Sequence, residues 1–284
     1  MFAEIIMIQK IALIAGQGQL PLFIAGYAQK AGIDCHVISL KHLGDEALSA
    51  FQTVSYALTE LESIIGYLKK HDIRHIIMAG KVHRQVLSAG PIDATSAALL
   101  EKSLPLGDDA ALKAILALLH QEGIEIVPTS ICLPDHQLPT EFDNRPDMGD
   151  IKALLNHAIA LHTSIGHFDI GQALIIQDSR VLSIEGAEGT DALINRTAPL
   201  IDKNRQHRLF FKAAKSGQNK LLDPPVIGDE TIKLCAKAGI NLIAIEAGHC
   251  LLTHTKDEIN ALCNAHNIRL VSVTMPDTSI KEQG

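Results

Sequence analysis

The sequence predicts an α/β fold in two domains, an N-terminal Rossmann-like parallel sheet followed by a C-terminal α/β domain. Three observations predict it. In the first half, short apolar runs alternate with helical stretches, which is the pattern of parallel strands with covering helices. Near the middle, a stretch rich in proline and polar residues interrupts this alternation. The length of 284 residues is about two domains at roughly 150 residues each.

The first half is expected to hold four buried strands separated by amphipathic helices. An apolar run that stops at a glycine, as at Gly16 and Gly80, is typical of the end of a buried parallel strand. Glycine also ends the expected helices, at Gly32 and Gly123. The expected strands are 11–15, 35–40, 75–79 and 124–127, and the expected helices are 20–31, 60–71 and 108–121.

The connection between the domains is expected at 133–149, where Pro134, Pro139 and Pro146 lie among Asp, Asn and Arg. The domains are therefore assigned to residues 1–138 and 146–284. Beyond the connection, the pattern predicts a helix, a hairpin about the turn Asp178-Ser179, and then further alternation. The expected helices are 150–163, one from 191 onward and 229–238, and the expected strands are 173–177, 181–185, 209–213 and 242–246.

Composition excludes several classes of protein. Hydrophobic residues make up 47% and charged residues 20% of the chain, which is ordinary for a folded protein and not for a disordered one. The formal net charge of -7 gives the chain as a whole no attraction for nucleic acid. The five scattered cysteines show no CxxC spacing, and we expect reduced thiols. No signal peptide or bilayer-spanning run is apparent, so we expect a cytoplasmic protein.

The first candidate site is the turn Gly16-Gln17-Gly18, between an expected strand and helix. Backbone N–H groups and the helix dipole favour a phosphate at such a turn. Pro21 replaces the third glycine of the dinucleotide fingerprint, and the second strand ends at Leu40 without the usual acid. NAD or FAD binding is therefore disfavoured. The alternative is a tight turn that needs glycine for its backbone.

Two further candidates are short clusters next to expected strand or helix ends. Gly80-Lys81, followed by His83 and Arg84, comes directly after a strand, where ligands of open α/β sheets bind. Its cations suit a pyrophosphate, and a solvated basic turn is the alternative. Asp108-Asp109 opens a helix, where capping is the favoured interpretation and Mg²⁺ binding the alternative.

The second half holds two more candidates. The motif EGAEGTD precedes a helix and contains the candidate substrate contacts Glu188, Thr190 and Asp191; capping by Thr190 or Asp191 is the alternative. Lys212 and Lys215 then lead from a strand into a loop with one acid, Asp223. Cations that hold phosphates beside a carboxylate are what phosphoryl transfer needs. The 14 histidines form no HExxH pair and receive no metal role.

Taken in order, these segments resemble the LpxI family of UDP-2,3-diacylglucosamine pyrophosphatases. The resemblance covers the chain from about Ile11 to Val273, and the ordered set is more specific than any single motif. The matching segments are IALIAGQGQLP, MAGKVHR, LGDDAAL, DIGQALIIQDSRVLSIEGAEGTDALI, FKAAKSGQ, DPPVIG and AIEAGHCLL.

The resemblance implies hydrolysis of UDP-2,3-diacylglucosamine to UMP and 2,3-diacylglucosamine 1-phosphate in lipid A synthesis. It implies Mg²⁺, with Mn²⁺ as an alternative, and two domains that hold the lipid substrate between them. The expected partners exclude nucleic acid, allow at most peripheral contact with the cytoplasmic face of the inner membrane, and leave a homodimer open. A catalytically impaired nucleotide-sugar or lipid-binding protein and a dinucleotide-dependent oxidoreductase are the alternatives.

The mechanism expected from this resemblance has water attacking one phosphorus of the pyrophosphate. Lys212 or Lys215 and Mg²⁺ would neutralise the developing charge, and Asp223 would orient the water or bind the metal. Gly16, Gly18 and the Gly80-Lys81 turn would hold the nucleotide.

The chain departs from the family pattern in the loop after the two lysines. Ser216 stands where the family has proline, Asn219 where it has an acid, and Leu221 where it has arginine. Asn219 and Leu221 cannot supply the charges of those residues, and they support the impaired-protein alternative.

Overall fold

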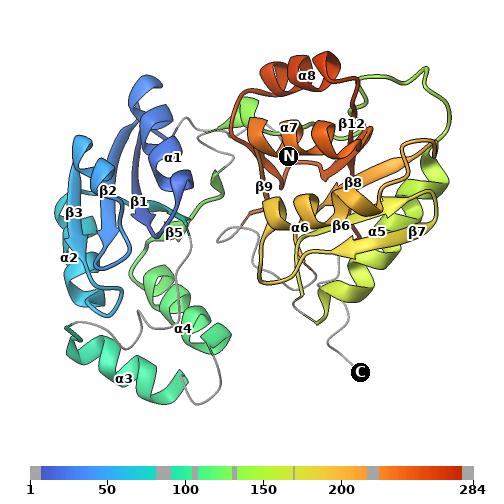
Figure 1. Ribbon diagram of the computed structural model, residues 1–284. Helices are drawn as coiled ribbons and strands as arrows, with labels where there is room; N and C mark the ends of the chain where they lie inside the picture. Colours follow the sequence, from blue (N-terminus) through green and yellow to red (C-terminus); the bar gives the residue numbers. More distant parts are fainter. Residues whose placement is uncertain are drawn as a thin grey trace. The chain divides into compact units, whose positions relative to one another are not determined.

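The computed structural model describes residues 8–80, 91–103, 108–129, 133–168, 170–215 and 224–276. The chain forms two compact units, with the change from the first to the second between Leu133 and Pro134. Figure 1 shows the helices and strands of each. Within the described ranges, none of the helices has the length and apolar character needed to cross a lipid bilayer.

The N-terminal unit is built on a five-stranded sheet in the order β3-β2-β1-β4-β5. All neighbouring pairs are parallel, and this order is the one found in doubly wound nucleotide-binding sheets. The strands are β1 (Lys10–Ala15), β2 (Asp34–Leu40), β3 (Thr53–Tyr56), β4 (His75–Ala79) and β5 (Glu125–Ile126).

Helices cover both faces of this sheet, because the central strands are apolar on both sides. Ile11 and Leu13 of β1 pack with the side chains of α1 (Gln19–Lys30), whereas Ala12 and Ile14 pack with those of α2 and α4. This alternation is the two-residue period of a strand buried on both faces. The other helices among the described residues of the unit are η1 (Glu46–Ala50), α2 (Leu61–Lys70), α3 (Ala94–Ser103) and α4 (Asp108–Gln121).

The C-terminal unit has a mixed five-stranded sheet in the order β12-β10-β8-β6-β7. The three strands β8, β10 and β12 are parallel, whereas β6 is antiparallel to both β8 and β7. The strands are β6 (Ala173–Gln177), β7 (Arg180–Ile184), β8 (Arg208–Lys212), β10 (Leu242–Glu246) and β12 (Arg269–Val273). A separate parallel pair joins β9 (Val226–Ile227) to β11 (Leu251–Leu252).

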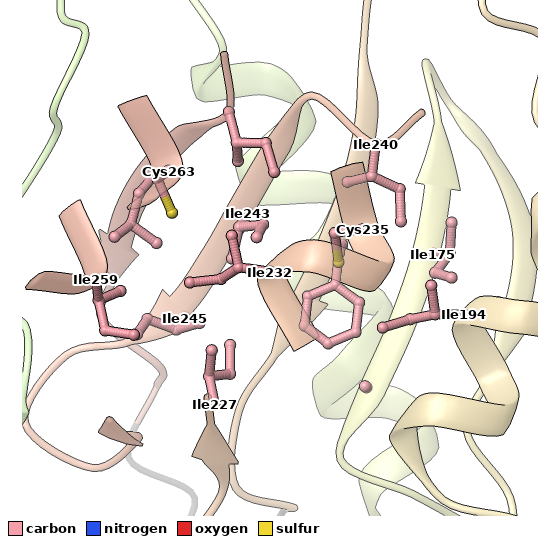
Figure 2. Packing of buried hydrophobic residues seen from close by; sticks show 14 of the residues in the cluster. Ile175, Ile194, Ile227, Ile232, Cys235, Ile240, Ile243, Ile245, Ile259 and Cys263 are labelled. Carbon is pink, nitrogen blue, oxygen red and sulfur yellow. The ribbon is translucent and has the colours of Figure 1, made fainter. Parts of the chain in front are cut away.

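Two apolar clusters hold this unit together, one on each face of the sheet. One cluster lies under α6 (Thr190–Thr197), α7 (Asp229–Ala238) and α8 (Lys256–Ala265), and Figure 2 shows Ile194, Ile232 and Cys263 in it. The other lies under α5 (Lys152–Gly166). The described part of the unit also contains the short helices η5 (Pro134–His136) and η6 (Ala198–Leu200).

The segment expected to connect the domains packs against the C-terminal unit. The Asp143 carboxylate accepts hydrogen bonds from Arg269 at 2.6 and 3.1 Å, and Asp143 also pairs with Val271 as an antiparallel bridge. Burial acts to raise the pKa of Asp143, but the Arg269 guanidinium and the Arg145 N–H outweigh it and hold the pKa below its usual value. The segment is therefore fixed to the edge strand β12 by a partly buried ion pair.

The predicted α/β fold with two sheets is confirmed. Five predicted elements have the same bounds in the structure: 75–79, 108–121, 173–177, 229–238 and 242–246. The structure adds strands β3, β9, β11 and β12 and helices α3 and α8, which the sequence patterns did not single out.

Candidate functional site

One edge of the C-terminal sheet collects charged side chains from the ends of three strands, β7, β8 and β10. Lys212 ends β8 and Glu246 ends the neighbouring parallel strand β10. Strand β6 runs in the opposite direction, so its first residue, Ala173, pairs with Lys212. The backbone N–H of Glu185, just past β7, donates to the Ala173 carbonyl at 2.8 Å. This edge is where parallel strands present their carboxyl ends, the usual position of ligands in open α/β sheets.

A chain of hydrogen bonds links the lysine to a carboxylate through a hydroxyl. The Lys212 ammonium Nζ donates to Thr190 Oγ1 at 2.8 Å, and Thr190 Oγ1 donates to Glu185 Oε1 at 2.7 Å. The second carboxylate oxygen, Glu185 Oε2, accepts from the backbone N–H of Gln172 at 3.0 Å. Lys212 and Glu185 are only 6% and 8% exposed, so these bonds replace water for two charged groups.

Glu246 supplies a second buried carboxylate at this edge. It is 2% exposed, and its Oε2 accepts from the backbone N–H of Ala214 at 2.9 Å. Burial raises the pKa of the Cys250 thiol to about 12, the positive charge of Lys212 opposes the rise, and the Glu246 carboxylate adds to it. Both charges therefore lie near Cys250, and this thiol stays protonated and unreactive at neutral pH.

Helix α6 begins beside the lysine. Its N-cap is Gly189, with φ of 84°, and no described side chain caps it. The alternative in which Thr190 or Asp191 caps this helix is therefore wrong, because Thr190 lies one position inside it and bonds Lys212 and Glu185 instead. An uncapped helix N-terminus presents free N–H groups and the positive end of the helix dipole, which favour an anion.

A neutral histidine lies close to this network. His162 is fully buried, with its ring centroid 5.4 Å from that of Phe211. Its Nε2 lies 3.1 Å from the Gln172 carbonyl oxygen, which can only accept, so Nε2 carries the proton. Burial lowers the pKa of His162, although the Gln172 carbonyl and the charges of Glu246 and Glu185 act in the opposite direction. The ring therefore adds no positive charge near neutral pH.

The other candidates of the C-terminal half are placed less centrally or lie outside the described residues. Asp191 is in the first turn of α6, and Glu188 forms an ion pair with Arg196 at 2.8 Å. Lys215 is half-buried, three residues beyond Lys212. Asp223, expected as catalytic residue and metal ligand, lies outside the described residues, as do Asn219 and Leu221.

The N-terminal unit brings its two glycine turns together. The Gly16 N–H donates to the Ala79 carbonyl at 2.8 Å. Gly80 has φ of 91°, and a Cβ there would lie 2.8 Å from Gln17 O and 2.8 Å from the carbonyl carbon of Gly16. Gly18, with φ of 110°, precedes α1, which no described side chain caps. Glycine is therefore required at this edge by backbone shape.

Nucleotide binding by this edge stays a prediction. Lys81, His83 and Arg84 lie outside the described residues. Helix α4 begins at Asp108, but the side chains of Asp108 and Asp109 are likewise outside what the structure describes.

The described residues contain no preformed set of ligands for the expected metal. Within them, His, Cys, Asp and Glu side chains form no group of three or more that could hold an ion. The two buried carboxylates nearest Lys212 accept bonds from backbone N–H groups instead. These residues do not fit Mg²⁺ as they stand, and the expected ligand Asp223 is not among them. The requirement for Mg²⁺ or Mn²⁺ stays a prediction.

Sequence reasoning missed the residues that anchor the lysine. Glu185 was noticed as part of EGAEGTD but received no role, and Glu246, Gln172 and His162 were not singled out. A signal existed for Glu246, because an acid that closes the apolar run LIAIE is unusual at the end of a buried strand.

The fold is that of a two-unit α/β protein in which a buried lysine lies beside the N-terminus of a helix at the edge of the C-terminal sheet. The chain belongs to the LpxI family: residues 10–136 match the LpxI N-terminal domain and residues 142–271 match the LpxI C-terminal domain.

A relative from Caulobacter vibrioides, named UDP-2,3-diacylglucosamine pyrophosphatase LpxI, is 32% identical over 266 residues. The alignment covers 89% of this chain and 94% of the relative. Two solved structures that match this chain are much less similar. The biotin carboxylase domain of Hydrogenobacter thermophilus 2-oxoglutarate carboxylase has a TM-score of 0.26 at 11% identity, covering 61% of this chain and 37% of its own. Mycobacterium tuberculosis glycinamide-RNase-transformylase T has a TM-score of 0.25 at 14% identity, covering 63% of this chain and 44% of its own.

These matches correct the function predicted from the sequence. That prediction made Mg²⁺ part of the activity and kept a dinucleotide-dependent oxidoreductase as an alternative. The relative is named a pyrophosphatase, so the oxidoreductase alternative is wrong. Neither this name nor the two domain matches includes a metal requirement, and the function is restated without one.

Proposed function

We propose that this chain is a UDP-2,3-diacylglucosamine pyrophosphatase and that its phosphate-binding group is Lys212. Membership of the LpxI family and the name of the Caulobacter relative support the substrate class. One observation carries the assignment of the site: a buried ammonium group at the carboxyl end of β8 donates to a hydroxyl on the open first turn of α6.

The surroundings of Lys212 favour an anionic ligand. Removing an ammonium group from water costs several kcal/mol, by an order-of-magnitude estimate, unless partners compensate it. Its described hydrogen-bond partner, Thr190, is a neutral hydroxyl, and the nearest carboxylate of this chain of bonds lies one step further on. A phosphate oxygen would complete the compensation, with the free N–H groups of α6 as further donors.

Hydrolysis requires that water form a bond to one phosphorus while the bond from that phosphorus to the bridging oxygen breaks. Negative charge then develops on the phosphoryl oxygens and on the leaving oxygen. A positive group fixed in a site with little water stabilises that charge far more than a solvated one does. Lys212 fulfils this condition because its side chain is buried and its direction is set by Thr190.

The substrate is a lipid, which bears on where the protein acts. Leaving an acyl chain in water costs about 0.8 kcal/mol per CH₂, so the substrate is expected to reside in a membrane. We therefore propose peripheral contact with the membrane surface that carries the substrate.

The direct experiment supplies UDP-2,3-diacylglucosamine in detergent micelles and follows the phosphomonoester products by mass spectrometry. The wild type should consume the substrate, whereas Lys212→Met should be slower by about 10²–10³, the loss typical of removing one charge-stabilising donor. Binding without turnover by the wild type would contradict the proposal and support the impaired binding protein that Asn219 and Leu221 suggest.

A further inference from the structure

We infer that Glu185 is a positioning residue for Lys212 and acts through the hydroxyl of Thr190. The inference rests on the proposed role of Lys212 in pyrophosphate hydrolysis. It assigns Glu185 no contact with the substrate. Its function is to set the direction of a hydroxyl, and through that hydroxyl the place of the ammonium group.

The polarity of the hydrogen bonds supports this role. An ionised carboxylate only accepts, and an ammonium only donates. The single proton of Thr190 must therefore point to Glu185 Oε1, at 2.7 Å, which turns an oxygen lone pair toward Lys212 Nζ, at 2.8 Å. Without the carboxylate, the hydroxyl can rotate, and the lysine no longer meets a fixed acceptor.

Glu185 is itself held firmly by the start of β6. Its Oε2 accepts from the Gln172 N–H at 3.0 Å, and its own N–H donates to the Ala173 carbonyl at 2.8 Å. Gly171 packs so closely that a Cβ there would lie 2.2 Å from the Glu185 carbonyl oxygen. The side chain is 8% exposed, so the carboxylate has little freedom to reach a different partner.

The hydroxyl between the two charges has a chemical consequence. A carboxylate in direct contact with the ammonium would compete with the phosphate for its protons. With Thr190 between them, Glu185 orients the lysine and balances its charge from one bond further away. The remaining protons of the ammonium stay available for an incoming phosphate.

The test is a double-mutant cycle on turnover of UDP-2,3-diacylglucosamine. Glu185→Gln and Thr190→Val should each lower kcat/KM by about 10²-fold, mainly in kcat, because a displacement of about 1 Å in a catalytic group costs that much. Thr190→Ser keeps the hydroxyl and should stay close to the wild type. Adding Glu185→Gln to Lys212→Met should cause no further loss, because residues that act as one unit are not additive.

Thr197→Val is the matched control. Thr197 is a fully buried threonine of the same helix, and its hydroxyl bonds Ser183 Oγ and the Leu193 carbonyl, both at 2.7 Å. Because Thr197 is fully buried and Thr190 only partly so, its loss is expected to disturb the packing of α6 at least as much. It does not touch the lysine, and kcat/KM should stay unchanged. If Glu185→Gln does not fold, Thr190→Val replaces it in the cycle with Lys212→Met, because Thr190→Val leaves both charges in place.

A second readout separates this inference from the proposed function. The ammonium signal of Lys212 in a ¹H–¹⁵N spectrum, identified by its loss in Lys212→Met, should move or broaden in Glu185→Gln and Thr190→Val and remain in Thr197→Val. An unmoved signal, or additive losses of turnover in the cycle, would overturn the inference. If the Lys212 signal moves in Glu185→Gln and Thr190→Val but the wild type does not hydrolyse the substrate, the proposed function is overturned and the positioning role stands.

Discussion

The carboxyl edges of the two sheets differ in what determines their structure: close backbone contacts in the N-terminal unit and hydrogen-bonded polar side chains in the C-terminal unit. At the N-terminal edge, Gly16 and Gly80 bring backbone against backbone, with no room for a Cβ at Gly80. At the C-terminal edge, the chain Lys212–Thr190–Glu185 places two buried charged groups on either side of a partly buried hydroxyl. The structure at the same position of an α/β sheet can therefore be determined by backbone shape or by charge. Substitutions that add atoms should disrupt the glycine edge, whereas substitutions that remove polar atoms should disrupt the charged edge.

The largest expected effect is at the charged edge. Lys212→Met keeps the length and apolar stem of the side chain but removes the ammonium, and we expect turnover of UDP-2,3-diacylglucosamine to fall by about 10²–10³. The fold should survive, because the stem still fills its place in the sheet edge. Steady-state kinetics with circular dichroism on the same sample measure both quantities.

Lys233→Met is the control for that change. Lys233 is an exposed lysine of α7 that pairs with Asp229 at 2.7 Å, and such an exposed pair contributes little to stability. Turnover should be unaffected. Equal losses in the two variants would show that net charge matters and that the position of Lys212 does not.

The second prediction adds one methyl group at the glycine edge. Gly80→Ala forces a side chain into the left-handed region and places its Cβ 2.8 Å from backbone atoms of the Gly16 turn. Backbone strain and overpacking each cost about 1–3 kcal/mol, so we expect a loss of about 3 kcal/mol in the free energy of unfolding of the N-terminal unit. Urea denaturation monitored by hydrogen exchange should place the loss in residues of β1 and β4. A loss below about 1 kcal/mol would mean that the turn yields easily.

The contrast between these edges also accounts for what could be predicted from the sequence. Gly16 and Gly80 end apolar runs, and a glycine at that position is typical of a buried strand that passes into a tight turn, so both turns could be located directly. Regular elements with strong periodicity were predicted equally well, down to the bounds of α4, α7 and β10. Strand β3 was missed because its four residues are only half-buried to exposed, which gives no apolar run.

The order of the hydrogen bonds in the charged site could not be predicted, because these bonds join residues of different helices and strands. Lys212 and Thr190 were each selected, but they lie 22 positions apart in the sequence, and only the fold brings the first turn of α6 beside the end of β8. The role of Glu185 depends on the direction of one hydroxyl proton, which no spacing encodes. Helix α8, in contrast, did carry a readable signal, since Thr255 and Glu258 form a capping box.

The third prediction compares a buried histidine in each unit. Burial lowers the pKa of both His36 and His162, although the Asp34 charge acts in the opposite direction on His36. Their neutral forms are favoured in the fold, so their contribution to stability is complete above the unfolded pKa of about 6.5 and is lost as pH falls toward the folded pKa. Each can contribute up to about 1.4 kcal/mol per pH unit in that window.

Hydrogen exchange between about pH 7.5 and about pH 5, a range that spans the unfolded histidine pKa, measures this effect separately in each unit. His162→Gln should flatten the pH dependence of protection in the C-terminal sheet and leave that of the N-terminal sheet unchanged, and His36→Gln should do the reverse. An identical pH dependence in wild type and both variants would mean that other groups, such as paired carboxylates, determine the acid sensitivity.

The smallest expected effect tests whether crowding distinguishes the two edges. Gly189, the N-cap of α6, has φ of 84°, close to the 91° of Gly80, but a Cβ there would meet nothing within 4 Å. Gly189→Ala therefore adds strain without overlap, and we expect a loss of about 1 kcal/mol, at the low end for such strain because the open space lets the backbone relax. The difference of about 2 kcal/mol from Gly80→Ala isolates the cost of overlap. Chemical denaturation of both variants under one condition measures it. Equal losses at the two glycines would show that the positive φ alone sets the cost, and that the N-terminal edge is no more crowded in effect than the charged one.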